Sequence, residues 1–308
     1  MTIFTAYHNR IYPLSSKKDS IVLLYQCCYG KNVISSIPQE TAKNTSNLYD
    51  PISSDLVRIH VDAYLAGGFS LKTLQAMAKN VADIPFDEKR FNDLLASHAC
   101  SCPATIAHSL DYIHHYHPNY IVAFKKDLSV DMIAYQFNQF LKKQPPHSVI
   151  ALEGKCGSGK TTLSSLIQPG LRYSVIPMDD FFLPDTLRTP MRFQESGGNI
   201  HYELVSEVLS TFQQKELTHY LAYDCTTNTY RQKDISPQSS LLLEGVYSYH
   251  PFFRKFVNRL IYLDIDEEKQ LQRIKQRKLA DRFFREWIPL ENDYFEKEKI
   301  VVLADLIL

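Results

Sequence analysis

The stretch that most constrains this chain is EGKCGSGKTTLSSL, residues 153–166, which directly follows the apolar run HSVIAL. The apolar run predicts a buried strand, and residues 160–168 predict a helix. Between them, residues 154–161 fit the pattern G-x-x-x-x-G-K-[ST], known as Walker A. After a strand and before a helix, this pattern wraps its backbone N–H groups around the phosphates of a nucleotide. The sequence therefore predicts a parallel α/β sheet with a nucleotide site at the end of this strand.

The residue types in this loop suit a bound triphosphate. Glycines can adopt positive φ, so that backbone N–H groups point at the β-phosphate. Lys160 is expected to reach the β- and γ-phosphates, and the Thr161 hydroxyl is expected to ligate Mg²⁺. We therefore expect ATP and Mg²⁺ as cofactors. The residues expected to bind the nucleotide are Gly154, Cys156, Gly157, Ser158, Gly159, Lys160, Thr161 and Thr162.

Cysteine usage points to a reducing compartment. Six cysteines in 308 residues do not make the dense framework of a disulfide-stapled domain, so the cytoplasm is the expected location. Cys156 occupies a variable position of the loop, where a small side chain fits. Because it precedes the expected helix, we expect a lowered thiol pKa and sensitivity to thiol reagents.

From about residue 129 onward, apolar runs alternate with helical patterns, as in a doubly wound parallel sheet. The expected strands are 147–153, 172–178, 219–224, 240–245, 259–265 and 304–308. The expected helices are 129–142, 160–168, 202–212 and 267–278. A chain of this length is long for one domain. We expect a P-loop NTPase-type domain over 129–308 and a smaller, mainly helical N-terminal domain over 1–128.

The N-terminal region offers less. Two helical patterns, 55–66 and 70–80, are separated by Gly67 and Gly68. Helix, tight turn and helix is the skeleton of a DNA-binding helix-turn-helix, but any small helical domain contains such a hairpin. Basic residues on the second helix are few, which disfavours nucleic acid as a partner and leaves the role of this region open.

Histidines and cysteines gather in SHACSCPATIAHSLDYIHHYH, residues 97–117. Both residue types bind Zn²⁺, but C-x-C followed by scattered histidines matches no common ligand spacing. We therefore interpret the cluster as ordinary loop and helix residues.

The charge balance and the apolar runs exclude other classes. Lys and Arg together number 34, as do Asp and Glu, so no overall basic field attracts nucleic acid or an anionic membrane. The N-terminus lacks the pattern of a secretory signal, and the longest apolar runs are too short to span a bilayer. We expect no membrane partner, and self-association into a homo-oligomer stays open.

Three classes of phosphate-loop protein can be compared. A GTPase would carry N-K-x-D, which the sequence lacks, and an ABC-type ATPase needs L-S-G-G-Q, of which residues 195–199 (ESGGN) keep only S-G-G. A small-molecule kinase needs a carboxylate beside the γ-phosphate to accept a proton, and an arginine-bearing lid that excludes water. The sequence offers both, so a kinase fits best.

The candidate carboxylates follow two of the expected strands. Asp179 and Asp180, in IPMDDFF, end the strand after the loop helix and should face the same sheet edge as Lys160. Glu244 closes the apolar run LLLE, the usual position of an acid that helps to hold Mg²⁺. Guanidinium groups that could stabilise a transferring phosphoryl group follow the last long strand. They are Arg273, Arg277, Arg282 and Arg285.

The stretch 129–308 resembles the uridine kinase/phosphoribulokinase family of P-loop kinases, in particular bacterial uridine kinase-like proteins. The motifs that carry the resemblance occur in the family's order over roughly 180 residues. They are GKCGSGKTT (154–162), MDDFF (178–182), RTPMRFQESGGNIHYELV (188–205), LLLEGVYSYHP (241–251) and RIKQR…RFFREWIPLENDYF (273–295). The match is specific for the family and not for a substrate.

The resemblance implies residue roles. Asp179 takes the position of the general base, with Asp180 as second choice, and Glu244 that of an acid associated with Mg²⁺. The loop around G-G-N-x-x-Y is associated with the acceptor in the family, and the lid carries arginines. This implicates Arg192, Asn199 and Tyr202 for the acceptor, and Arg277, Arg282 and Arg285 for the lid.

His201 departs from the family. Bacterial relatives commonly carry an acid at this position, which could bind ribose hydroxyls with both oxygens. A neutral imidazole can still hydrogen-bond a hydroxyl, so His201 is kept as a substrate candidate, but it lacks the bidentate grip.

Together these features predict a Mg²⁺- and ATP-dependent kinase that phosphorylates a hydroxyl of a small metabolite, with a nucleoside such as uridine or cytidine favoured. One alternative is a kinase of another alcohol, such as pantothenate or a sugar. A second is an ATP-binding regulatory protein whose N-terminal helical hairpin binds DNA.

Overall fold

The structure is a computed structural model that describes residues 11–29, 47–53, 55–82, 89, 92, 93, 96, 108–236, 238–277 and 280–308. Packing divides the chain into an N-terminal unit, Met1–Phe140, and a C-terminal unit, Leu141–Leu308. The division falls within α7 (Val130–Lys142) because the first turns of this helix pack on the N-terminal unit, where the Gln136 side chain donates to the Tyr49 carbonyl at 3.0 Å.

The C-terminal unit is built on a five-stranded parallel sheet with the order β10-β9-β4-β8-β5. Its strands are β4 (Val149–Glu153), β5 (Tyr173–Pro177), β8 (Ser240–Glu244), β9 (Arg259–Tyr262) and β10 (Leu306–Ile307). Every residue of the neighbouring strands β4 and β8 is buried, as expected for strands covered on both faces. The predicted α/β class is therefore confirmed.

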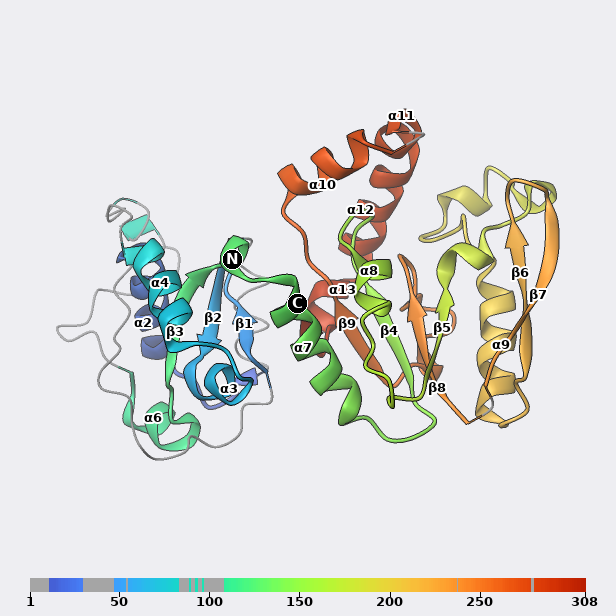
Figure 1. Cartoon of the computed structure of the whole chain (residues 1–308). Helices are drawn as coiled ribbons and strands as arrows, with labels where there is room; N and C mark the ends of the chain where they lie inside the picture. The colour runs from blue at the N-terminus through green and yellow to red at the C-terminus, as the bar shows by residue number, and fades with distance from the viewer. Residues whose placement is uncertain are drawn as a thin grey trace. The chain divides into compact units, whose positions relative to one another are not determined.

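Some helices of this unit lie beside the sheet, and others lie beyond one of its ends (Figure 1). The α-helices are α8 (Lys160–Ser164), α9 (Tyr202–Gln213), α10 (Glu267–Lys275), α11 (Ala280–Arg282), α12 (Ile288–Lys297) and α13 (Ile300–Leu303). Short 3₁₀ turns are η2 (Met178–Phe181), η3 (Asp185–Leu187), η4 (Arg192–Gln194) and η5 (Arg254–Phe256), and η6 (Phe283–Trp287) is a π-helix. In Figure 1, α10, α11 and α12 lie together above α8, which follows β4.

Residues 219–224 form a strand, but not in the main sheet. They are β6 (His219–Asp224), which pairs antiparallel with β7 (Thr229–Asp234) in a separate hairpin. We did not predict β7, because all but one of the residues of TYRQKD are exposed and the segment shows no apolar alternation.

The N-terminal unit contains a three-stranded antiparallel sheet with the order β1-β2-β3, which the sequence did not lead us to expect. The strands are β1 (Tyr49–Pro51), β2 (Leu56–His60) and β3 (Tyr120–Phe124). The described helices are α2 (Lys17–Tyr29), α3 (Val61–Ala66), α4 (Leu71–Ala82) and α6 (Leu110–Tyr116), with a 3₁₀ turn η1 (Lys125–Asp127). Leu23, Ile52, Val81 and Val122 belong to its hydrophobic core.

The predicted helix over 55–66 is wrong in its first half. Residues 56–60 form the middle strand β2, in which every residue is buried, and only residues 61–66 are helical. Val57 and Ile59 are β-branched and favour a strand once neighbours pair on both sides. The hairpin that suggested DNA binding is therefore shorter than expected, with the six-residue α3 before Gly67 and Gly68 and α4 after them.

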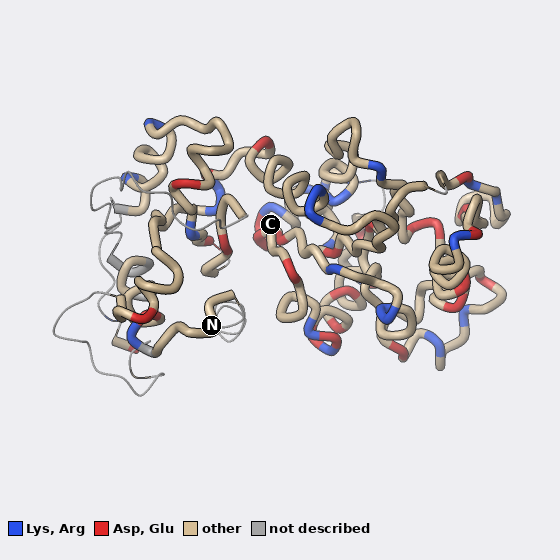
Figure 2. Tube along the Cα trace, turned by 90° about the horizontal axis from the view of Figure 1, so that it is seen from below, with Lys and Arg blue, Asp and Glu red and all other residues tan. Residues whose placement is uncertain are grey.

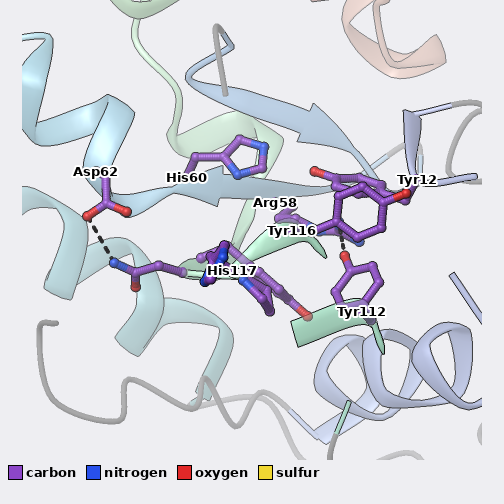
Figure 3. Close-up of a pocket in the computed structure, with 10 residues that line it drawn as sticks. Tyr12, Arg58, His60, Asp62, Tyr112, Tyr116 and His117 are labelled. Atoms are coloured by element: carbon purple, nitrogen blue, oxygen red, sulfur yellow. Dashed lines mark hydrogen bonds between the residues drawn. The ribbon is translucent and has the colours of Figure 1, made fainter. Parts of the chain in front are cut away.

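The N-terminal unit also holds a small pocket (Figure 3). The buried Arg58 guanidinium donates to the Tyr112 hydroxyl at 3.1 Å and lies over the rings of Tyr12 and Tyr120. Nearby, the Asp50 carboxylate accepts from His60 and Tyr12, each at 2.8 Å. These hydrogen bonds and ring contacts link Tyr12, β1, β2, β3 and α6 in the interior of the unit.

Charge and membrane features of the described residues are simple. Acidic and basic side chains are interspersed along both units in Figure 2. Within the described ranges, no helix has the length and apolarity needed to cross a bilayer, and no set of three or more His, Cys, Asp or Glu side chains is arranged to hold a metal ion. His98, Cys100 and Cys102 lie outside the described residues.

Candidate active site

The loop between β4 and α8 has the backbone shape that the Walker A pattern predicts. Gly154, Gly157 and Gly159 have φ values of 146°, 79° and 105°. A Cβ atom on Gly154 would lie 2.3 Å from the Leu263 carbonyl oxygen, so only glycine fits where the loop leaves the sheet. The loop therefore exposes backbone N–H groups as an anion-binding concavity.

Lys160 lies on the inside of this loop. Its ammonium group donates to the carbonyls of Gly154 at 2.6 Å and Lys155 at 3.0 Å. The Ser158 hydroxyl oxygen is buried and has no hydrogen-bond partner among the described residues. Because a buried polar group without a partner is costly, the Ser158 hydroxyl is suited to a phosphate oxygen. The Lys160 ammonium brings a positive charge to the same loop.

Thr161 and Glu244 form the candidate metal position. Strands β4 and β8 are neighbours, with Leu152 opposite Glu244, so the acid closes β8 beside the loop. The Thr161 hydroxyl lies 3.2 and 3.4 Å from the two Glu244 carboxylate oxygens. Burial raises the Glu244 pKa and nearby Asp179 adds to this, while Lys160 opposes it. Mg²⁺ takes one or two protein oxygens and completes its shell with phosphate and water, so this pair fits the ion.

Asp179 lies in η2, directly after β5, at the same end of the sheet. It is solvent-exposed and has no hydrogen bond or ion pair with any described residue. Desolvation by the surrounding protein nevertheless raises its pKa, with a contribution from Asp180, while Lys160 and Arg277 lower it. Asp179 is thus a carboxylate that lies within the field of both cations and is available to a ligand.

Asp180 is placed differently. Its side chain is buried and accepts from the Tyr220 hydroxyl at 2.6 Å and from the Lys233 ammonium at 2.7 and 2.8 Å. These partners lie on β6 and β7, so Asp180 fastens the hairpin to η2. Sequence analysis made Asp180 the second choice for the general base and a substrate candidate. In the structure its oxygens are engaged by the hairpin, whereas Asp179 lies near Lys160.

The lid arginines divide into two groups. Arg273 of α10, one of the four arginines noted in the sequence but not among the lid residues that the resemblance implied, donates to the carbonyls of Gly157 at 2.8 Å and Ser158 at 3.1 Å. Arg277 lies over the Phe283 ring at 5.3 Å and close enough to Asp179 to lower its pKa. The other two expected lid arginines are exposed, and Arg282 pairs with Glu286 at 3.0 Å.

The expectation for Cys156 is wrong. Its thiol is buried, and burial together with the neighbouring Glu291 carboxylate raises its pKa to about 12. The Cys156 backbone N–H donates to Glu291 at 2.8 Å, which brings this acid close. Since α8 is only five residues long, its N-terminus does not offset burial and a nearby negative charge.

Glu153 is a second acid that sequence analysis missed. It ends β4, is fully buried, and accepts from the Tyr249 backbone N–H at 2.9 Å and the Tyr294 hydroxyl at 2.8 Å on one oxygen. The other oxygen has no partner among the described residues. Burial raises its pKa to about 7, against the hydrogen bonds and Lys160, which lower it. An acid closing an apolar strand directly before the glycine loop was the available signal.

We expect Glu153→Gln to stabilise the C-terminal unit at alkaline pH. Between the ordinary pKa near 4.5 and the folded-state value of about 7, the folded protein binds more protons than the unfolded chain, so stability falls as pH rises through this window. The shift corresponds to a loss of up to about 3 kcal/mol above pH 7. Gln cannot titrate and keeps both hydrogen bonds to its oxygen, so the variant should match the parent near pH 5 and exceed it at pH 8.

Chemical denaturation at pH 5 and pH 8 tests this expectation, with the exposed Glu216→Gln as control. Equal stability of Glu153→Gln and its parent at pH 8 would contradict the burial of an ionised carboxylate.

The loop over residues 188–202 is held by Arg192. This side chain donates to both Glu203 carboxylate oxygens at 2.7 and 2.8 Å and to the carbonyls of Gly198 and Ile200, and it lies 3.5 Å above the Tyr202 ring. A Cβ atom on Gly198 would lie 1.7 Å from the Arg192 carbonyl oxygen, which explains the glycine. The Arg192 side chain, which sequence analysis had assigned to the acceptor, therefore shapes the loop instead.

The other acceptor candidates of this loop lie nearby. The Tyr202 hydroxyl donates to Glu195, and its ring stacks on His250 with centroids 4.8 Å apart. The Asn199 side chain hydrogen-bonds Tyr247. His201 begins α9, and its Nδ1 is buried without a hydrogen-bond partner among the described residues.

Comparison with known proteins adds fold-level likenesses. No protein-family model matches the sequence, and no curated protein matches it. Among solved structures, the chain is similar to a "possible uridine kinase" from Bacillus stearothermophilus, at 22% identity and a TM-score of 0.44, over 58% of this chain and 96% of that one. It is also similar to a "putative fructose transport system kinase" from Silicibacter sp. TM1040, at 19% identity and a TM-score of 0.41, over 54% and 91%.

At such identities and TM-scores, neither likeness bears on the substrate of this chain.

Proposed function

We propose that this chain is an ATP-dependent phosphotransferase that moves the γ-phosphate of ATP to a hydroxyl of a small metabolite. The observation that carries the proposal is the position of Asp179. It is an exposed carboxylate at the same end of the sheet as Lys160, Thr161 and Glu244, while its neighbour Asp180 is occupied by the hairpin. A carboxylate available beside a phosphate-binding loop suits an acceptor whose proton must leave.

In the proposed reaction, the acceptor oxygen bonds to the γ-phosphorus as the bond from that phosphorus to the β–γ bridging oxygen breaks, and ADP leaves. The acceptor's hydroxyl proton passes to Asp179, whose raised pKa favours taking it. Lys160 and the loop amides hold the phosphates, and Arg277 adds positive charge near Asp179. Mg²⁺, for which Thr161 and Glu244 are the proposed ligands, supplies neutralising charge on the phosphate oxygens when bound.

The acceptor we favour is a nucleoside. Tyr202, His250 and the half-exposed Phe252 form an aromatic cluster at the GGNIHY loop, with ring centroids of Tyr202 and Phe252 4.7 Å apart. Arg192 and His250 already lie against the Tyr202 ring, so the half-exposed Phe252 is the ring of this cluster that we expect to stack on a planar base. The buried Nδ1 of His201 is a polar atom that a hydroxyl could satisfy.

The regulatory alternative loses support, since residues 56–60 form β2 and the first helix of the hairpin that suggested DNA binding is only six residues long. The alternative of another alcohol acceptor stays open.

The test is a panel of acceptors with purified protein, ATP and Mg²⁺. ADP formation should depend on the added acceptor and be fastest with uridine or cytidine, with the phosphorylated nucleoside identified by ³¹P NMR. Turnover only with pantothenate or fructose would replace the nucleoside by another alcohol. ATP binding with no acceptor-dependent turnover on any compound would overturn the phosphotransferase and favour a sensor.

A further inference from the structure

Side chains of α10 and α12 hold the two consecutive peptide groups on either side of the Cys156 Cα atom. The backbone N–H of Cys156 donates to the Glu291 carboxylate at 2.8 Å, and the Cys156 carbonyl accepts from the Gln270 side chain at 3.0 Å. Both contacts are buried. Each of these two peptide groups is bonded to a side chain of another element, so neither can rotate without breaking a hydrogen bond.

The same helix α12 holds the base of the loop at a second point. One turn after Glu291, the Tyr294 hydroxyl donates to Glu153, the last residue of β4, at 2.8 Å. Tyr294 is fully buried, and Glu291 is 7% exposed. The helix therefore contacts the chain both before and after Gly154, where the loop leaves the sheet.

We propose that Glu291 is a positioning residue that latches the phosphate loop to α12, so that the loop keeps its phosphate-binding shape only while this helix is docked. The inference rests on the nucleotide site of the proposed function, but not on its acceptor or on turnover. Glu291 touches no reacting atom. It acts through the peptide group between Lys155 and Cys156, just before Gly157 with its left-handed φ of 79°.

The carboxylate oxygen, and not its charge, is the part that matters for the latch. A Gln side chain at position 291 keeps an acceptor oxygen for the Cys156 N–H, whereas Ala removes it. A negative charge beside a triphosphate site opposes binding. Glu291→Gln should therefore preserve the latch, with nucleotide affinity equal to or above that of the parent, and Glu291→Ala should release the loop.

The alkylation rate of the buried Cys156 thiol shows whether the loop is held in place, and this measurement needs no catalysis. In the full-length protein, alkylation of Cys156 by iodoacetamide is followed by peptide mass spectrometry, with the exposed Cys225 of the same chain as internal reference. We expect Glu291→Ala to raise the Cys156 rate at least tenfold relative to Cys225, and to weaken ATP binding, measured by calorimetry, at least fivefold. Glu291→Gln removes the charge that raises the Cys156 pKa but keeps the acceptor oxygen, so it should label Cys156 much more slowly than Glu291→Ala and bind ATP at least as tightly as the parent. The exposed control Glu296→Ala should stay within threefold of the parent in both measurements.

Each result decides between support and rejection. A Glu291→Ala variant with parental Cys156 labelling and parental ATP affinity overturns the latch. So does a Glu291→Gln variant that behaves like Glu291→Ala, because the acceptor oxygen would then not be the cause. If Cys225 accelerates as much as Cys156, the change is general loosening and the latch is rejected. Failure of the acceptor panel leaves all these outcomes readable, since none requires phosphoryl transfer.

Discussion

Replacing Asp179 with Asn should lower the rate of acceptor phosphorylation by roughly 10²- to 10⁴-fold, the usual contribution of a general base. The amide keeps the size of the carboxyl group but cannot take the acceptor proton at neutral pH. ATP affinity should change little, because Lys160 and Thr161 are untouched and Asp179 makes no hydrogen bond within the described residues. Removing a negative charge near Lys160 favours a slightly tighter complex, if any change is seen.

The measurement separates chemistry from binding. Single-turnover phosphorylation gives the transfer rate, and calorimetry gives ATP affinity. The exposed Asp293→Asn, which loses only an ion pair with Lys297, should match the parent in both. Transfer by Asp179→Asn at close to the parental rate would remove Asp179 from the role of base.

Asp180→Asn provides the contrast that sequence alone could not supply. Its carboxylate pairs with Lys233 and accepts from Tyr220, so the substitution weakens the attachment of β6–β7 to η2. We expect a lower melting temperature and a smaller loss of transfer than for Asp179→Asn. The reverse order would mean that the acid contacting the acceptor had been misassigned between these neighbours.

The parts of the fold that sequence analysis predicted correctly are those with a strong local signal. Strands β4 and β8 are continuous apolar runs closed by an acid, and the glycines between β4 and α8 have no strain-free alternative. Such signals depend on burial and backbone sterics, which apolar runs and glycines indicate locally in the sequence. β2 failed because LVRIH suits a strand or a helix until the pairing partners are known.

The residues of the candidate site also divide into those with a local sequence signal and those without one. The loop, Asp179 and Glu244 were placed because motif spacing and strand ends locate them. Glu291 and Gln270, by contrast, reach Cys156 from 135 and 114 residues away, and no local pattern predicts such contacts. The same limit explains Cys156, whose thiol pKa is set by burial and by Glu291 and not by its position before a helix.

Replacing Lys160 with Met should lower phosphoryl transfer on the order of 10²- to 10³-fold or more, as expected for loss of a preorganised cation at a transferring phosphoryl group. Met keeps a similar length and fills the buried position without a charge. Unlike Asp179→Asn, this variant should also bind ATP more weakly, because the ammonium contacts phosphates before and during transfer.

The loss should be specific to Lys160 and not to the loop's total charge. Lys155, five residues earlier in the same loop, offers its carbonyl to Lys160 while its own side chain is partly exposed. Lys155→Met removes the same charge and should keep transfer within a few-fold of the parent. Because Lys160 also lowers the pKa of Asp179 and Glu244, Lys160→Met should shift the acidic limb of the pH–rate profile to higher pH. A variant with residual activity but an unshifted profile would contradict the electrostatic coupling of the three groups.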